Sequence, residues 1–334
     1  MYCLAPRGAW RAGLMGAEAQ HASAAIVSVV LPTFNRLKYL RPTIESVYAQ
    51  TFADWELIIA DDGSDLETTQ YLQSLVGEPR VMVVWLPHTG RPSVVRNAAL
   101  LRATGEYIAF LDSDDLWAPR KLERQIETLR ARVNCRWSYT AFVRVDGSGK
   151  PLLEEAQRPW IPHEGDIFEQ VATSRASIRT PSVLATRQLI AQAGGFDEGL
   201  LSAEDYDLWL RLALYSEVAI VDEPLVYVRC HEDNHTSDWQ SAFMGRDRML
   251  SRRQQLVDAG RRSLLRKERM RNALKLAATH AERGAQDRMF RALWESLAYS
   301  WTYPRWWLSG LNMVLRPYLP RPLLDSYWKR RRGA

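Results

Sequence analysis

Short apolar runs alternate with amphipathic stretches through the first 112 residues of the chain. Four apolar runs, the first of them rich in β-branched residues, predict buried strands over 26–31, 55–60, 81–85 and 107–111. Between them, apolar residues recur at helical spacing over about 40–48, 67–75 and 94–102. Because strand and helix alternate along this part of the chain, we predict an α/β fold with a doubly wound, mostly parallel sheet.

The pattern becomes less regular after residue 112. It predicts an amphipathic helix over 121–132 and a strand over 137–145 that ends in a hairpin-like turn. Two further short strands are predicted over 218–221 and 225–228, separated by Asp222-Glu223-Pro224. Beyond about residue 237 only helical periodicity remains. We therefore expect a disordered, Ala/Gly-rich leader over 1–25, an α/β domain over 26–237 and a helical tail over 238–334.

The composition is that of a folded protein, with 46% hydrophobic and 25% charged residues among 334. The three cysteines form no CxxC pair, so neither a zinc knuckle nor a disulfide framework is indicated. This cysteine usage favours a reducing cytoplasm. No run of 18 apolar residues occurs, so we expect no membrane span.

The net charge of +5 hides a strong asymmetry. Residues 245–334 hold 21 Lys and Arg against 7 Asp and Glu, whereas residues 1–244 hold 23 against 32. A basic segment of this kind predicts an acidic partner. We do not expect nucleic acid, because no recognised nucleic-acid-binding fold accompanies the charge.

Aromatic residues in the basic tail suggest how it could bind. Phe290, Trp294 and Trp301 recur at helical spacing among arginines, and a basic amphipathic helix suits an anionic membrane surface. The closing cluster Lys329–Arg332 would add electrostatic attraction. The alternative is a helical subdomain that packs its aromatic stripe on the α/β core. If the tail binds lipid, the protein is cytoplasmic with peripheral contact at the inner face of the membrane.

The first of two acidic clusters follows the fourth predicted strand directly, as Asp112-Ser113-Asp114-Asp115. Ligands bind at the carboxyl edge of an open α/β sheet. Carboxylates this close together repel one another unless a cation or proton compensates, and oxygen-only ligands suit Mg²⁺ or Mn²⁺. The sequence therefore predicts a metal site here. The alternative is a solvated acidic turn that caps the next helix.

The second acidic cluster is Glu204-Asp205, which follows a turn that begins at Gly194-Gly195. A carboxylate at the mouth of a metal site can deprotonate an incoming hydroxyl. The alternative is a pair of carboxylates favoured only by the helix dipole. His231 follows a predicted strand, and its imidazole is an acceptable further ligand for Mn²⁺, although a lone histidine is more often structural.

A nucleotide pocket is predicted where the first two strands end. Thr33, Phe34, Asn35 and Arg36 offer a hydroxyl, an aromatic face, an amide and a guanidinium, and Asp62 follows the neighbouring strand. Arg96 could face diphosphate oxygens or lie on a solvated helix face. Neither GxGxxG nor GxxxxGK[ST] is present, which argues against a Rossmann oxidoreductase and a P-loop enzyme.

These segments together resemble a known family. The string Val27–Arg36 is similar to the opening of a family 2 glycosyltransferase with a GT-A fold. Six further segments follow in the order found in that family: Ser46–Phe52, Ile58–Ser64, Arg96-Asn97, Phe110–Asp115, Gly194–Asp197 and Glu204–Trp209. The resemblance covers about 26–237, two-thirds of the chain, and implies a GT-A-like doubly wound sheet.

The resemblance also implies an activity. This is the inverting, metal-dependent transfer of a sugar from a nucleoside diphosphate sugar donor to a hydroxyl of a glycan or lipid-linked acceptor. Two alternatives remain open: a nucleotide-sugar-binding protein without turnover, and a sugar nucleotidyltransferase, which would release pyrophosphate.

Individual residues receive roles by the same resemblance. Asp112 and Asp114 fall on a DxD-type motif, with Asp115 beside it, that bridges the diphosphate and Mn²⁺ or Mg²⁺. Asp205 falls on the catalytic base and Glu204 on its acidic neighbour, while His231 resembles a histidine found near the metal. Pro32, Thr33, Phe34 and Asp62 fall on positions that hold the base and ribose.

Overall fold

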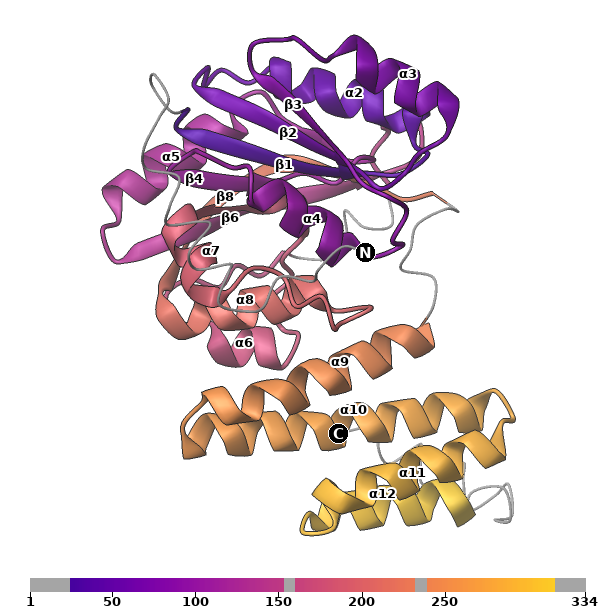
Figure 1. Ribbon diagram of the computed structural model, residues 1–334. Helices are drawn as coiled ribbons and strands as arrows, with labels where there is room; N and C mark the ends of the chain where they lie inside the picture. Colours follow the sequence, from indigo (N-terminus) through magenta and orange to yellow (C-terminus); the bar gives the residue numbers. More distant parts are fainter. Residues whose placement is uncertain (1–24, 153–159, 232–238, 316–334) are drawn as a thin grey trace. The chain divides into compact units, whose positions relative to one another are not determined.

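In the computed structural model, which describes residues 25–152, 160–231 and 239–315, eight strands form one sheet (Figure 1). Their order is β3-β2-β1-β4-β7-β6-β8-β5. The chain divides into two compact units, Met1–Ser237 and Asp238–Ala334. The sheet lies in the first unit, and the described part of the second is helical. Nearly all of the predicted leader and the whole Lys329–Arg332 cluster lie outside the described residues.

The first half of the sheet is parallel, as predicted. Its strands are β1 (Val27–Thr33), β2 (Trp55–Asp61), β3 (Val81–Trp85) and β4 (Tyr107–Phe110). The helices between them are α2 (Leu37–Tyr48), α3 (Leu66–Ser74) and α4 (Pro92–Leu100). Figure 1 shows α2 and α3 on one face of these strands and α4 on the other. The predicted doubly wound, mostly parallel arrangement is thus confirmed.

The alternation of side chains along β1 explains how the sheet is covered on both faces. Val27, Val29 and Leu31 point to one face, where they join a core that includes Leu40 and Ile44 from α2. Successive strand residues point to opposite faces, so Val30 is buried on the other side, and none of these β1 residues is exposed to solvent. A strand buried on both faces reads as a continuous apolar run, which is why the sequence predicted it.

The second half of the sheet is mixed. β7 (Val183–Thr186) runs antiparallel to β4 and to β6 (Cys135–Val145). β8 (Glu217–Arg229) is parallel to β6, and the short β5 (Leu116–Trp117) lies antiparallel at the edge. The helices of this half are α5 (Lys121–Ala131), α6 (Phe168–Ala172), α7 (Arg187–Ala193) and α8 (Glu204–Tyr215).

Two predictions about this second half were wrong or incomplete. The two short strands expected on either side of residues 222–224 are one continuous strand, β8, whose pairing with β6 shifts register around Ala141 and Pro224. A β-bulge of this kind lets a strand continue past residues that do not fit the ladder. The pattern also did not predict β5, β7 or α7, which are two, four and seven residues long.

The second unit consists of α9 (Trp239–Arg253), α10 (Ala259–Glu282), α11 (Gln286–Ser300) and α12 (Pro304–Leu315), with a 3₁₀ turn, Gln254–Leu256, between the first two. It has its own apolar core, formed by Met270, Ala277, Met289, Ala292, Leu293 and Trp306. An ion pair between Asp247 and Arg269, at 2.9 Å, joins α9 to α10. No helix within the described ranges is both long and apolar enough to cross a bilayer.

Candidate active site

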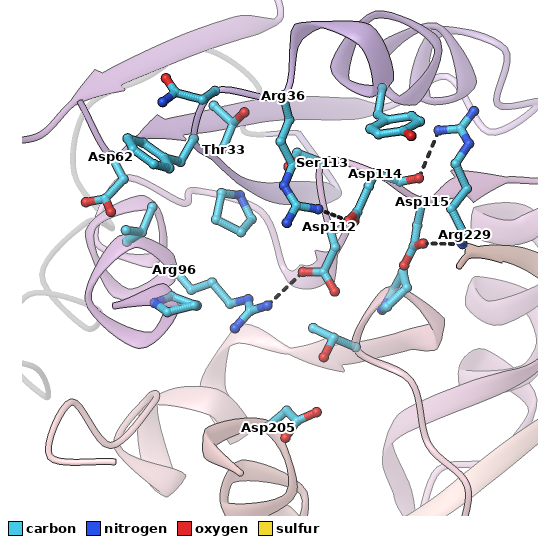
Figure 2. Close-up of a pocket in the computed structure, with 18 of the residues that line it drawn as sticks. Thr33, Arg36, Asp62, Arg96, Asp112, Ser113, Asp114, Asp115, Asp205 and Arg229 are labelled. Carbon is cyan, nitrogen blue, oxygen red and sulfur yellow. Dashed lines mark hydrogen bonds and ion pairs between the residues drawn. The ribbon is translucent and has the colours of Figure 1, made fainter. Parts of the chain in front are cut away.

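The carboxyl ends of β1, β2 and β4 lie together and border a cleft of about 780 Å³ (Figure 2). The parallel register produces this meeting, because Thr33 pairs with Asp61 on one side and Val30 pairs with Phe110 on the other. The loops that follow the three strands therefore open into one cleft. All the site residues predicted from the sequence line it: Pro32, Thr33, Phe34, Asn35, Arg36, Asp62, Arg96, Asp112, Asp114, Asp115, Glu204, Asp205 and His231.

Two carboxylates of the first acidic cluster are each paired with an arginine. Asp112 Oδ1 accepts a hydrogen bond from Arg96 Nη2 at 2.7 Å, and Asp114 Oδ2 is ion-paired with Arg36. His231 Nε2 lies 3.1 Å from the same Asp114 oxygen. These side chains are only partly exposed, so the arginines supply the positive charge that closely spaced carboxylates require.

Asp115 is placed differently from its two neighbours. Its carboxylate is buried, and Oδ1 accepts a hydrogen bond from the backbone N–H of Arg229 at 2.8 Å. Burial, followed by the charges of Asp114 and Asp112, raises the pKa of the Asp115 carboxyl well above its ordinary value. The alternative in which this cluster caps the next helix is wrong, because α5 begins at Lys121 and its N-cap residue is Arg120.

Arg96 connects the two acidic clusters. It projects from α4, is 7% exposed, and donates from Nη1 to Glu204 Oε1 at 3.1 Å as well as from Nη2 to Asp112. Burial alone would lower its pKa, but Asp112 and Glu204 raise the pKa of Arg96 above its ordinary value. The alternative of a solvated helix face is therefore wrong for this residue.

Asp205 stands at the start of α8, across the cleft from Thr33 and Arg36 (Figure 2). Ala203, the residue just before α8, has φ of +61°, a left-handed conformation that is costly for a residue with a Cβ and that recurs at functional sites. Asp205 Oδ1 accepts a hydrogen bond from the Tyr206 N–H at 2.7 Å. Burial and then the charge of Glu204 raise the pKa of Asp205 to about 6.

Asn97, beside Arg96 on α4, holds the loop that leads to α8. Its Nδ2 donates to the Phe196 carbonyl at 3.0 Å and to Glu198 Oε1 at 2.8 Å, while its Oδ1 accepts from the Phe196 N–H at 2.9 Å. The side chain is buried. The resemblance included Asn97 in a motif, but no local pattern indicated a partner that lies 99 residues further along the chain.

The loop after β3 organises the end of the cleft at which Phe34 and Asp62 lie. The Phe34 ring stacks on His88 with centroids 4.1 Å apart. Asp62 Oδ1 accepts from the Thr89 N–H and hydroxyl, both at 2.8 Å, and its Oδ2 accepts from the Gly90 N–H at 2.9 Å. Asp62 therefore shapes this loop in addition to bordering the cleft. His88 was not predicted, because a histidine in a polar loop carries no local signal.

Asn35 and Thr33 complete this side. Asn35 adopts φ of +49°, which asparagine tolerates better than most residues, and its Oδ1 accepts from the Asp65 N–H at 2.6 Å. The Thr33 hydroxyl is buried without a hydrogen-bond partner in the described structure. A buried hydroxyl at the cleft wall is a candidate contact for a bound ligand.

Comparison with known proteins identifies the family. A family model described as "Glycosyl transferase family 2" matches residues 28–170. The Escherichia coli protein "UDP-Glc:alpha-D-GlcNAc-diphosphoundecaprenol beta-1,3-glucosyltransferase WfgD" is 36% identical over 200 residues, a match that covers 59% of this chain and 73% of WfgD. The chain belongs to glycosyltransferase family 2. It spans 29%, 34% and 50% of the length of three other curated relatives.

Solved structures show that the fold is shared. Residues 1–349 of S. aureus TarS, crystallised with UDP-GlcNAc, align with a TM-score of 0.55 at 17% identity, covering 83% of this chain and 93% of that one. The mannosyltransferase PcManGT of Pyrobaculum calidifontis, in complex with GDP-Man and Mn²⁺, aligns with a TM-score of 0.53 at 17% identity, covering 96% and 94%. The predicted GT-A-like fold class is thus confirmed for this family 2 glycosyltransferase.

The side chains in the cleft of this glycosyltransferase can be compared with the ligands that a divalent cation requires. Within the described part of the chain, no three His, Cys, Asp or Glu side chains are grouped closely enough to hold a metal ion by themselves. Mg²⁺, however, is usually bound by one or two carboxylates together with substrate phosphates. Asp112, Asp114 and the imidazole of His231 supply donors of that kind, so the residues fit a cation that a diphosphate helps to hold.

Proposed function

We propose that this protein is an inverting, metal-dependent glycosyltransferase. It moves a sugar from a nucleoside diphosphate sugar to a hydroxyl of a glycan or lipid-linked acceptor. One observation carries the proposal: Asp112 and Asp114 lie on one side of a single cleft, and Asp205 lies on the other. Family membership supports the reaction class.

The donor is assigned to the side of the cleft formed by β1, β2 and their loops. A volume of about 780 Å³ is in the range of ligand pockets and can hold a nucleoside diphosphate sugar. In this proposal Pro32, Thr33, Phe34 and Asp62 contact the base and ribose. Asn35 orders the same loop, and Arg36 and Arg96 approach the diphosphate. The UDP-GlcNAc and GDP-Man named for the two structural neighbours are consistent with such a donor.

Asp112 and Asp114 would hold Mn²⁺ or Mg²⁺ between the protein and the diphosphate, with His231 beside them. A bound cation supplies stabilisation of the negative charge that develops on the leaving diphosphate. Asp115, with Oδ1 engaged by the Arg229 backbone, would position this loop from behind. Arg36 and Arg96 already lie against the two carboxylates, and they would share the compensation of charge.

Asp205 is assigned as the base. Its position across the cleft from the diphosphate side lets it take the proton of an acceptor hydroxyl that attacks from the face opposite the leaving group, which gives inversion. A pKa near 6 leaves most of the group ionised at neutral pH while keeping it basic enough to accept a proton. Glu204, held by Arg96, would keep the start of α8 in place.

The acceptor is assigned more broadly. The name of WfgD specifies an acceptor linked to diphosphoundecaprenol, which supports a lipid-linked glycan here. Such an acceptor is presented at a membrane surface, so we propose a cytoplasmic protein with peripheral contact at the inner face of the membrane.

Turnover against a panel of nucleotide sugars tests the proposal. We expect release of a nucleoside diphosphate from at least one donor, increased by an acceptor with a free sugar hydroxyl. Release of pyrophosphate from a sugar phosphate and a nucleoside triphosphate would instead identify a nucleotidyltransferase. Tight binding of a nucleotide sugar with no turnover of any acceptor would identify a binding protein.

The metal assignment has a separate test. We expect turnover to fall to background in excess chelator and to return with Mn²⁺ or Mg²⁺. Asp114→Ala should weaken metal-dependent binding of the nucleoside diphosphate, measured by calorimetry, as well as turnover. Full turnover in chelator would overturn metal dependence while leaving the transferase assignment intact.

A further inference from the structure

We propose that the outward side of α11 and α12 is a docking surface for an anionic phospholipid bilayer. This surface, called the aromatic face below, consists of Phe290, Trp294, Trp301, Trp307, Leu308 and Leu311. Their exposed fractions run from 50% for Phe290 to 76% for Trp294. The face includes three of the four tryptophans that are exposed among the described residues. The proposal does not depend on which sugar or acceptor the cleft uses.

The helical unit does not need these side chains for its own core. On α11, Met289, Ala292 and Leu293 point inward, and on α12 the ring of Trp306 does the same. The Trp306 Nε1 donates to Ser296 Oγ at 2.9 Å, so its polar atom is also satisfied inside. The aromatic face lies on the other side of the same two helices. Apolar patches of this kind mark interaction sites rather than folding cores.

The aromatic face has the chemistry of a membrane interface. Tryptophan rings are amphipathic and concentrate where hydrocarbon meets headgroups. Trp294, Trp301 and Trp307 line one shallow groove with Leu297 and Ala298. The Trp307 Nε1 donates to the Trp301 carbonyl at 2.8 Å, which ties the two helices together at the groove, while the Trp307 side chain stays 52% exposed.

The charge of the helical unit favours an anionic bilayer, rather than a second copy of the chain, as the partner of the aromatic face. Between residues 239 and 314 there are fifteen Lys and Arg against six Asp and Glu, a balance of +9. Arg288, Arg291 and Arg305 are exposed on the same two helices as the aromatic face. Two copies that met through this face would bring like charges together, whereas acidic headgroups complement them.

The lengths of the helices determine how the unit would sit on lipid. α11 has 15 residues and α12 has 12, and neither is long and apolar enough to span a bilayer. An amphipathic helix with a basic side lies in the plane of the interface, with its apolar side chains among the acyl chains. We therefore expect reversible surface binding that weakens with salt.

Vesicle co-sedimentation of the full chain tests the aromatic face. The probes are phosphatidylcholine vesicles with and without phosphatidylglycerol. We expect binding to the anionic vesicles only, and a loss of about tenfold or more in Trp294→Ser/Trp301→Ser/Trp307→Ser. The matched control is Trp85→Ser, which changes an exposed tryptophan of the first unit and should bind as the unchanged protein does.

The charge contribution has its own pair of variants. Arg291→Gln/Arg305→Gln should weaken binding by about fivefold for each arginine, and the effect should shrink as salt is added. The control Arg102→Gln/Arg130→Gln removes two exposed arginines from the first unit and should leave binding unchanged. Circular dichroism of each variant verifies the helical content.

Three results would overturn the proposal. The first is an absence of binding to anionic vesicles at low salt. The second is unchanged binding by the triple tryptophan variant. The third is a full chain that sediments as a dimer and does not bind vesicles, together with a triple variant that is monomeric. That result would assign the aromatic face to a second copy of the chain. Turnover of a soluble acceptor, measured in parallel, reports separately on the proposed function.

Discussion

The two units of this protein place the same kinds of side chains in opposite ways. In the first unit the large indole rings of Trp55, Trp137 and Trp209 are at most 1% exposed, and charged side chains converge on the walls of a cleft. In the second unit Trp294 and Trp301 point outward, 76% and 62% exposed. The first unit therefore lines a cleft with its charged side chains, whereas the second unit exposes its aromatic side chains on a surface.

The difference follows from how charge is compensated. In the cleft, Arg96 and Arg36 meet carboxylates at close range and with little water, where Coulomb interactions are strong. A site of this kind can stabilise the charge that develops during a reaction. In the second unit, the described residues include more exposed arginines than exposed acidic residues, and the proposed anionic bilayer would complement this excess.

The largest expected effect removes the base from the cleft. Asp205→Asn keeps the shape of the side chain but cannot take a proton, so turnover should fall by about 10² to 10⁴. Nucleotide-sugar affinity, measured by calorimetry, should stay close to that of the unchanged protein. Glu127→Gln is the control, since Glu127 pairs with Arg124 on the surface of α5. If Asp205→Asn retains half of the turnover, another residue is the base.

A second substitution tests whether the helical unit has a buried core that is distinct from its exposed surface. Trp306→Ala should destabilise α10–α12 by about 3–5 kcal/mol because it empties a buried site. Trp307→Ala, one position along and 52% exposed, removes one exposed hydrogen bond and should cost only about 1 kcal/mol. Hydrogen exchange over 259–315 in the full chain measures both. Equal effects would show that the two indoles do not divide between core and surface.

A third substitution loosens the link between α4 and the loop before α8. Asn97→Ala leaves the buried N–H and carbonyl of Phe196 without their partner, at a cost of about 1–3 kcal/mol. Thermal unfolding should report the loss, and turnover should fall because the loop positions Asp205. Gln73→Ala, at an exposed position on α3, is the control. Unchanged turnover would mean that α8 keeps its position without this anchor.

The smallest expected effect is that of pH on turnover and on stability. Because the pKa of Asp205 is raised to about 6, turnover should decline as the pH falls through 6 and be about tenfold lower one unit below it.

The raised pKa of Asp205 also means that the folded protein binds this proton more tightly than the unfolded chain does. Ionised Asp205 therefore costs stability at neutral pH. Asp205→Asn should melt at a higher temperature than the unchanged protein at pH 7, with a smaller difference at pH 5. A lower melting temperature at pH 7 would contradict the raised pKa.

Much of the fold was predictable because it follows from the local periodicity of apolar residues along the chain. A strand buried on both faces must be apolar throughout, so β1, β2 and β4 were visible as runs. Once the sheet is parallel, the carboxyl ends of these strands have to meet, and this alone gathers Thr33, Asp62 and Asp112 at one edge. The continuity of β8 was not predictable, because its bulge depends on pairing with β6.

The order of amino acids alone was therefore enough to predict the alternation of elements, the family motifs, the edge of the sheet where the chemistry would lie, and the excess of basic residues in the tail. Which charges meet depends on how the elements pack in three dimensions. This packing placed Arg96 between Asp112 and Glu204, engaged Asp115 with the Arg229 backbone, tied Asn97 to Phe196, and turned Trp294 outward and Trp306 inward. Periodicity fixes the side of a helix or strand on which a residue lies. The neighbour on that side comes from segments about 16 to 114 residues away, so it is set only when the elements pack.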